Sequence, residues 1–162
     1  RRVGESGCLE TTTRRSRAIT PTTPTIRVVN RQRHDPVPGA WLRRVAGRAM
    51  ARLKVRGRGV FGMAFVDSRL MRRLNREFTG HRGLPDVLSF RYEGEPVIGE
   101  VVVAPACARQ YAAAHGLPYR QELARYALHG LLPWLGHEDR TAAQRNRMHA
   151  MEDALLNTCG GK

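Results

Sequence analysis

The segment V-L-S-F-R-Y-E-G-E-P-V-I-G-E-V-V-V, residues 87–103, decides the fold. Both of its ends are rich in β-branched and aromatic residues, and E-G-E-P between them is typical of a turn. It therefore predicts two consecutive strands, at residues 87–90 and 97–103. Two similar β-rich runs, residues 26–30 and 60–66, predict two further strands earlier in the chain.

Helical periodicity accounts for most of the remaining sequence. Residues 38–53 predict an amphipathic helix with four arginines turned outward: Arg43, Arg44, Arg48 and Arg52. The next predicted helix is capped by Asp67 or Ser68 and turns four residues inward: Leu70, Met71, Leu74 and Phe78. Three more helices are predicted at residues 105–116, 118–135 and 141–156, the last with an inner face of Met148, Met151, Ala154 and Leu155. The order βαβαββααα predicts a single α+β domain in which a mixed four-stranded sheet packs with about five helices.

Charge and cysteine usage narrow the class of protein. Lys and Arg total 28 against 14 Asp and Glu, a formal net charge of +14, and only Lys54 and Lys162 are lysines. The planar guanidinium matches phosphate oxygens, so an arginine-rich surface indicates a nucleic-acid partner, although a high-GC genome gives the same bias. Three scattered cysteines argue against a disulfide framework and favour the cytoplasm. No apolar run approaches the roughly 18 residues of a membrane span.

Residues 1–25 differ in composition from the rest of the chain. They are rich in Thr, Pro and Arg with few apolar side chains, which predicts a disordered basic extension before a folded domain at residues 26–158. The extension has no apolar stretch of the secretory kind. An organellar transit peptide, an RNA-binding arm, a misplaced start site and a cloning remnant all remain open as its origin.

The segment H-G-L-L-P-W-L-G-H-E-D, residues 129–139, carries the main chemical signal. Histidines at i and i+4 on a helix can share one metal ion, and a helix-ending glycine lets a third ligand return to it, as in H-x3-H-x2-G-x2-H. His129 and Gly136 fit this pattern. Pro133 stands in the second ligand position and Asp139 in the third, where a carboxylate oxygen can still bind zinc. His137 is a further candidate ligand.

Several motifs together resemble those of the YbeY family of endoribonucleases. They are L-N-R-E-F at residues 74–78, D-V-L-S-F at 86–90, G-E-V at 99–101, the segment at 129–139, and the M-x-x-x-E of Met148 to Glu152. Their order and spacing agree from about residue 26 to residue 156. The resemblance implies a YbeY-like fold, one zinc ion, and cleavage of single-stranded RNA in ribosomal RNA maturation and ribosome quality control. It also implies the small ribosomal subunit as a partner, no membrane, and RNA rather than DNA.

The departures from the family pattern define the candidate site. The family's second and third histidine ligands match Pro133 and Asp139, and the arginine after its aromatic residue matches Thr79. Arg76 or Arg82 can supply that missing positive charge. The candidate catalytic residues are therefore His129 and Arg76, and the candidate zinc ligands are His129, Asp139 and His137. The remaining histidines are predicted to be surface residues: His34, His81, His115 and His149.

Four functions follow from these motifs. The first is a zinc-dependent endoribonuclease whose site is rebuilt around Asp139, and the second is a non-catalytic relative that binds RNA or the ribosome. The third is a metalloprotease, which is disfavoured because Gly130 stands where such an enzyme carries its glutamate base. The fourth is a gene product that has lost its function, which the Pro133 change allows.

Overall fold

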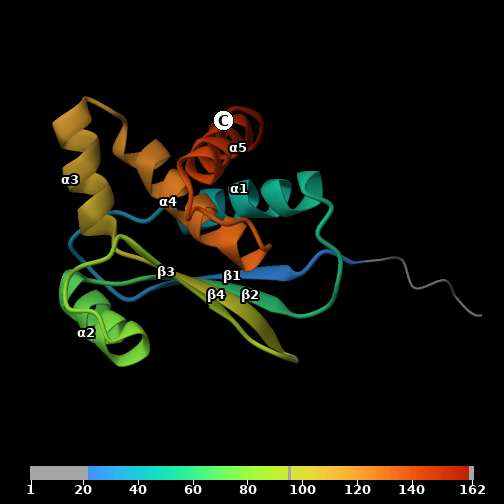
Figure 1. Ribbon diagram of the computed structural model, residues 1–162, viewed down its shortest axis with the longest axis horizontal. Coiled ribbons are helices and arrows are strands. Elements are labelled where there is room, and N and C mark those ends of the chain that lie inside the picture. Colours follow the sequence, from blue (N-terminus) through green and yellow to red (C-terminus); the bar gives the residue numbers. More distant parts are fainter. Residues whose placement is uncertain (1–21, 95, 161–162) are drawn as a thin grey trace, which may run out of the picture.

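The computed structural model describes residues 22–94 and 96–160, and within them the chain forms four strands and five helices (Figure 1). Disorder was predicted for residues 1–25, of which residues 1–21 lie outside these ranges. At its end the prediction is wrong, because Thr25 already belongs to the first strand and its N–H donates to the Gly59 carbonyl at 2.9 Å. The strands are β1 (Thr25–Asn30), β2 (Val60–Phe65), β3 (Val87–Arg91) and β4 (Val97–Val103). The helices are α1 (Gly39–Arg52), α2 (Ser68–Thr79), α3 (Pro105–His115), α4 (Tyr119–Trp134) and α5 (Ala142–Cys159).

The strands form one sheet in the order β1-β2-β4-β3. β2 pairs in parallel with both β1 and β4, whereas β3 and β4 pair antiparallel across the turn predicted between them. Parallel neighbours need a crossover and antiparallel neighbours only a short turn, so α1 and α2 occur where the topology requires them. The predicted α+β fold, with a mixed four-stranded sheet and five helices, is confirmed.

The two faces of the sheet are covered very differently (Figure 1). Helices α1, α4 and α5 lie over one face, and α2 alone lies over one end of the other. The closed face carries the larger core, which includes Phe61, Met63, Phe65, Leu123 and Leu131. A smaller cluster lies beneath α2 and includes Ala64, Met71 and Val102. No helix in the described part of the chain is both long and apolar enough to cross a lipid bilayer.

Two residues predicted to face inward are exposed instead. Phe78 packs against Phe90 of β3 and is still 64% exposed. Because β3 is an edge strand of the described sheet, no further strand there covers the outer side of the Phe78 ring. Ala154 is also exposed. The buried stripe of α5 consists of Met148, Glu152, Leu155 and Cys159. Because Glu152 occupies an inner position, this stripe is rotated away from Ala154.

A proline inside a helix cannot donate a backbone hydrogen bond and distorts the helix locally, and at Pro133 this distortion takes the form of a tightened helix end. α4 continues past Pro133 to Trp134, and the Gly136 N–H then donates to the Pro133 carbonyl at 2.9 Å. The His137 N–H donates to the Leu132 carbonyl at 3.0 Å, and Gly136 has a left-handed φ of 92°. This is the Schellman arrangement, in which a glycine after the helix lets its last carbonyls find donors. Pro133 lies in the final turn. It cannot donate to the His129 carbonyl and its ring crowds that carbonyl, but only the last residues of the helix follow the disturbance.

Candidate active site

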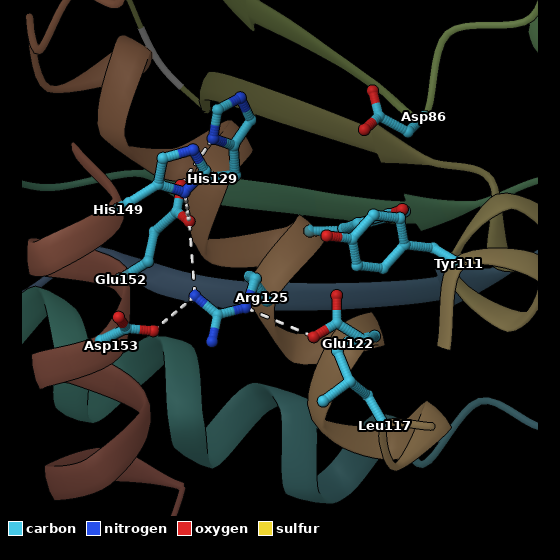
Figure 2. Close-up of a pocket in the computed structure, with 10 residues that line it drawn as sticks. Asp86, Tyr111, Leu117, Glu122, Arg125, His129, His149, Glu152 and Asp153 are labelled. Carbon is cyan, nitrogen blue, oxygen red and sulfur yellow. Dashed lines mark hydrogen bonds and ion pairs between the residues drawn. The ribbon is translucent and has the colours of Figure 1, made fainter. Parts of the chain in front are cut away.

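An open cavity of about 450 Å³ lies between α3, α4, α5 and the start of β3 (Figure 2). Its walls carry charged and aromatic side chains from all of these elements. They are Asp86, Tyr111, Leu117, Glu122, Arg125, Tyr126, His129, His149, Glu152 and Asp153. Cavities of this size hold small ligands or a few nucleotide groups, and several titratable groups converge here. His129 is the predicted site residue that lines it.

His129 is held by a buried glutamate of the neighbouring helix. Its Nδ1 lies 2.5 Å from Oε1 of Glu152, whose side chain is only 1% exposed, and this bond is drawn in Figure 2. The hydrogen bond to Glu152 raises the pKa of His129. Burial opposes that shift, and the negative charges of Glu152, Asp86 and Asp139 reinforce it. The ring is therefore more readily protonated than a free imidazole, and its proton on Nδ1 is directed to the carboxylate.

Arg125, one turn before His129 on α4, places a permanent positive charge among three carboxylates. Its Nη1 is 2.7 Å from Asp153 and 3.7 Å from Glu152, and its Nε is 3.4 Å from Glu122. Glu122 is also buried, and within the described residues its Oε2 has no hydrogen-bond partner. The guanidinium therefore offsets negative charge that would otherwise be unpaired inside the protein.

A glycine next to His129 sets how closely α4 approaches the sheet. A Cβ atom on Gly130 would lie 1.9 Å from Cγ2 of Val101 and 2.8 Å from Cγ1 of Val87. The hydroxyl of Ser89 donates to the Gly130 carbonyl at 2.5 Å. Only glycine permits this approach, which fixes the height of His129 above the sheet. The same packing leaves no room for the glutamate base of a metalloprotease at position 130.

The other predicted site residues lie elsewhere. Arg76 lines a hollow on α2, on the opposite face of the sheet, and His137 lines a separate hollow beside Trp134 and Arg91. Asp139 is exposed in the connection between α4 and α5, and its backbone carbonyl accepts from Arg145 at 3.2 Å. Its negative charge is the smallest of the causes that raise the pKa of His129, after Glu152 and Asp86. Their assigned roles in catalysis or metal binding stay predictions.

The described side chains do not fit the zinc centre that the family resemblance implies. Within residues 22–94 and 96–160, no group of three or more His, Cys, Asp and Glu side chains is placed to share one metal ion. The Nδ1 of His129 is already bonded to Glu152, which leaves Nε2 as its only available ligand atom. Pro133, one turn further along α4, offers no ligand atom at all. A zinc site needs at least three protein ligands, so this donor set is incomplete.

Sequence reasoning missed much of this cavity. His149 was predicted to be an ordinary surface residue, and it is 66% exposed, yet its Nδ1 lies 3.4 Å from Oε2 of Glu152. Glu122 and Arg125 were not singled out, although they share one face of α4 with His129 at spacings of three and four residues. Glu152 could have been predicted from the sequence, because a glutamate among the apolar residues of a helix needs a buried partner for its charge.

Comparison with known proteins adds an independent finding. A family model described as "Endoribonuclease YbeY" matches residues 28–160. Proteins named Endoribonuclease YbeY are 35% identical over 95 residues in Bdellovibrio bacteriovorus and 36% identical over 122 residues in Rhodopirellula baltica. These matches cover 58% and 72% of this chain, and each spans 63% of the relative's length. A relative of the same name in Geobacillus kaustophilus is 32% identical over 60% of this chain and 71% of its own.

Among solved structures, a solution structure of a Thermotoga maritima protein superimposes with a TM-score of 0.57. The match covers 82% of this chain and 90% of that one, at 20% sequence identity. At this identity the likeness supports the fold alone. The described sheet order and helix placement therefore recur in a protein whose sequence has diverged widely.

Proposed function

Because this chain belongs to the YbeY endoribonuclease family, we propose that it cleaves single-stranded RNA during ribosomal RNA maturation. The activity is assigned to a domain of residues 26–158, with ribosomal RNA and the small ribosomal subunit as its partners in the cytoplasm. We assign residues 1–25 to a basic extension that precedes this domain, although Thr25 itself belongs to β1. Support comes from the family match over residues 28–160 and from the chain's net charge of +14, which favours a polyanionic substrate.

The observation that carries the proposal is the His129–Glu152 pair at the wall of an open cavity. Hydrolysis of a phosphodiester forms a bond from a water oxygen to phosphorus, with a proton of that water passing to solvent, and breaks the bond to the departing ribose oxygen. That oxygen needs a proton, and an imidazolium with a raised pKa can donate it near neutral pH. Glu152 holds the ring through Nδ1, so that Nε2 is the nitrogen available to the substrate. His149, beside the same carboxylate, adds a second imidazole to the cavity.

Metal dependence is general in this family, but no step of the proposed reaction is routed through a metal ion. A zinc ion here would have to be held by His129 and Asp139, with His137 as a third ligand, and the described residues do not form such a group. The work assigned to this chain's own side chains is limited to binding the phosphodiester and moving a proton at Nε2 of His129.

A second candidate function rests on the same observation about metal ligands. Pro133 removes one family ligand, and the described residues offer no complete donor set, which favours a relative that binds RNA or the ribosome without cutting. In that protein, the fold and the arginine-rich surface serve recognition alone. The two candidates differ in zinc content and in cleavage, whereas they agree on RNA binding.

The deciding experiment measures both properties on one purified sample. Zinc per chain is determined by elemental analysis, and cleavage of a labelled single-stranded RNA is followed on gels with His129→Ala beside the control His81→Ala. For an enzyme that uses His129 as its proton donor, His129→Ala lowers the cleavage rate by about 100-fold or more and His81→Ala leaves it unchanged. A wild-type chain that binds RNA and never cuts it supports the second candidate.

A further inference from the structure

The α2 side of the sheet displays an aromatic ladder that the cavity does not use. Phe78 and Phe90 meet edge to face with ring centroids 5.2 Å apart, and Phe90 lies parallel to Tyr92, 6.5 Å away at an angle of 6°. Phe78 is 64% exposed and Tyr92 is 42% exposed. Both rings therefore keep accessible π-surface on a face that α2 covers only at one end (Figure 1). Exposed aromatic groups of this kind mark interaction sites more often than isolated exposed residues do.

The helix that carries Phe78 also presents a face of arginines to solvent. Arg69, Arg72, Arg73 and Arg76 line a hollow of about 580 Å³ on α2, together with Leu70 and the helix-capping Asp67. The Asp67 carboxylate accepts from the Leu70 N–H at 2.8 Å. Within the described chain, no carboxylate lies within 4 Å of these four guanidinium groups, since the ion pairs found there involve other arginines. Like charges three and four residues apart destabilise a helix, and a polyanion lying on this face would relieve that repulsion.

We propose that this α2 surface, made of the ladder Phe78–Phe90–Tyr92 and the arginines Arg69, Arg72, Arg73 and Arg76, is a second binding surface for single-stranded RNA. The proposal rests on the proposed function and extends it. Aromatic side chains that stack bases, beside a positively charged groove that follows the phosphates, are how proteins bind single strands without sequence preference. Four guanidiniums without a carboxylate partner among residues 22–94 and 96–160 favour a polyanion over an ordinary protein partner.

The α2 surface and the His129 cavity adjoin at the start of α3. Cys107, at the start of α3, packs against the apolar cluster beneath α2. The N–H of Ala104, the residue just before α3, donates to the Asp86 carbonyl at 3.0 Å. Asp86 lines the cavity, whereas Arg72 lines the α2 hollow. One RNA strand can therefore lie along α2 and pass this rim, so that the surface holds the substrate while the cavity receives one phosphodiester.

The test compares a normal oligoribonucleotide of eight residues with an abasic oligomer of the same length and charge, using the full chain. Phe78→Ala should weaken binding of the normal oligomer about tenfold and binding of the abasic oligomer less than twofold, because one stacked base is lost. The control Val29→Ala removes an apolar side chain of β1 that is 37% exposed and lies outside the ladder, and it should bind like the wild type. Thermal midpoints of each variant verify folding.

The arginines are tested by salt dependence. The pair Arg69→Gln/Arg73→Gln should lower the slope of log affinity against log salt by about 1.4, or 0.7 for each lost phosphate contact on a single strand. The pair Arg43→Gln/Arg44→Gln on α1 removes the same charge and should change the slope by less than half as much. Equal effects of the two pairs would mean diffuse charge attraction and would overturn the proposal.

The remaining outcomes separate this proposal from the function on which it rests. If the wild type binds both oligomers equally and Phe78→Ala changes neither, the stacking surface is disproved while endoribonuclease activity stands. If Phe78→Ala instead alters the sedimentation of the protein and not its RNA affinity, the ladder contacts another protein chain and the proposal fails. No binding of either oligomer at 50 mM salt overturns the surface and the proposed function together.

Discussion

The elements on both faces of the sheet have regularly spaced apolar residues. These residues are buried on one face and partly exposed to solvent on the other. On the closed face, Phe61 and Phe65 of β2 are 1% and 0% exposed beneath α1, α4 and α5. On the other face, Phe78 continues the apolar stripe of α2 and is 64% exposed. Periodicity shows which side of a helix is apolar, but it does not show whether another element lies against every turn of that side. The second RNA surface that we propose lies on this exposed part.

The sharpest way to test this contrast is to remove one phenylalanine from each face. Phe61→Ala deletes a ring that packs 4.9 Å from Trp134, centroid to centroid, and should lower the free energy of unfolding by about 4 kcal/mol. Phe78→Ala should lower it by about 0.5 kcal/mol or less, because most of that ring is already in water. Urea denaturation measures both. Equal losses would mean that something covers the α2 side in solution.

A pair of helical glycines sharpens the contrast further on the closed face. Gly130→Ala drives a Cβ atom into Val101 and should destabilise the protein by about 3 kcal/mol as α4 is displaced. Gly47→Ala, on α1, meets only Cδ1 of Ile26 at 4.0 Å and should stabilise the protein by about 0.5–1 kcal/mol through helix propensity. The comparison uses the same denaturation assay. A neutral Gly130→Ala would show that α4 is not held against the sheet as described.

The sequence predicted the fold well because its strands and helices have clear periodicity and boundary residues. Asp67 caps α2 and Thr141 caps α5 with a reciprocal bond to Gln144, and these are local signals that a sequence displays directly. The prediction that Phe78 is buried was wrong, because the exposure of this residue depends on β3 being an edge strand. That is a property of strand order, which periodicity does not contain.

The candidate site was less predictable because its contacts join distant segments. His129 was identified by a local motif, whereas its partner Glu152 lies 23 residues further on, in another helix. Arg125 and His149 could be recognised as part of the site only once both were seen to contact the Glu152 carboxylate. Whether Asp139 and His137 serve as ligands was judged from spacing alone, and the connection after Gly136 determines where they lie.

The pH dependence of stability tests the charge cluster on the closed face. The folded pKa of His129 is raised above its ordinary value of 6.5, so its bond to Glu152 contributes fully below that value. This contribution is lost as the pH rises through the folded pKa. We therefore expect the free energy of unfolding to fall from pH 6 upward, and less so in Glu152→Gln. Side-chain NMR should show the His129 pKa lowered in Glu152→Gln, and an unchanged value would mean that the pair does not form.

Replacement of Pro133 should give the smallest change in stability. It is also the most informative substitution for function. Replacing this exposed proline restores an N–H that can donate to the His129 carbonyl, which should add at most about 1 kcal/mol. Pro133→Ala and Pro133→His share that gain, so they form a matched pair. Only the histidine variant places a second imidazole one turn from His129, whose Nδ1 is already held by a carboxylate, the usual support behind a zinc-binding histidine.

We therefore expect Pro133→His to bind zinc far more tightly than either the wild type or Pro133→Ala, as measured by calorimetry with zinc alone. The double variant Pro133→His/Asp139→Ala should lose most of that gain if Asp139 is the third ligand, because two imidazoles hold zinc weakly. Zinc affinity that stays low in Pro133→His would contradict this expectation. It would mean that the loop carrying Asp139 cannot bring this carboxylate to His129. More than one substitution would then separate this cavity from a metal centre. RNA binding without cleavage would become the better description of the chain.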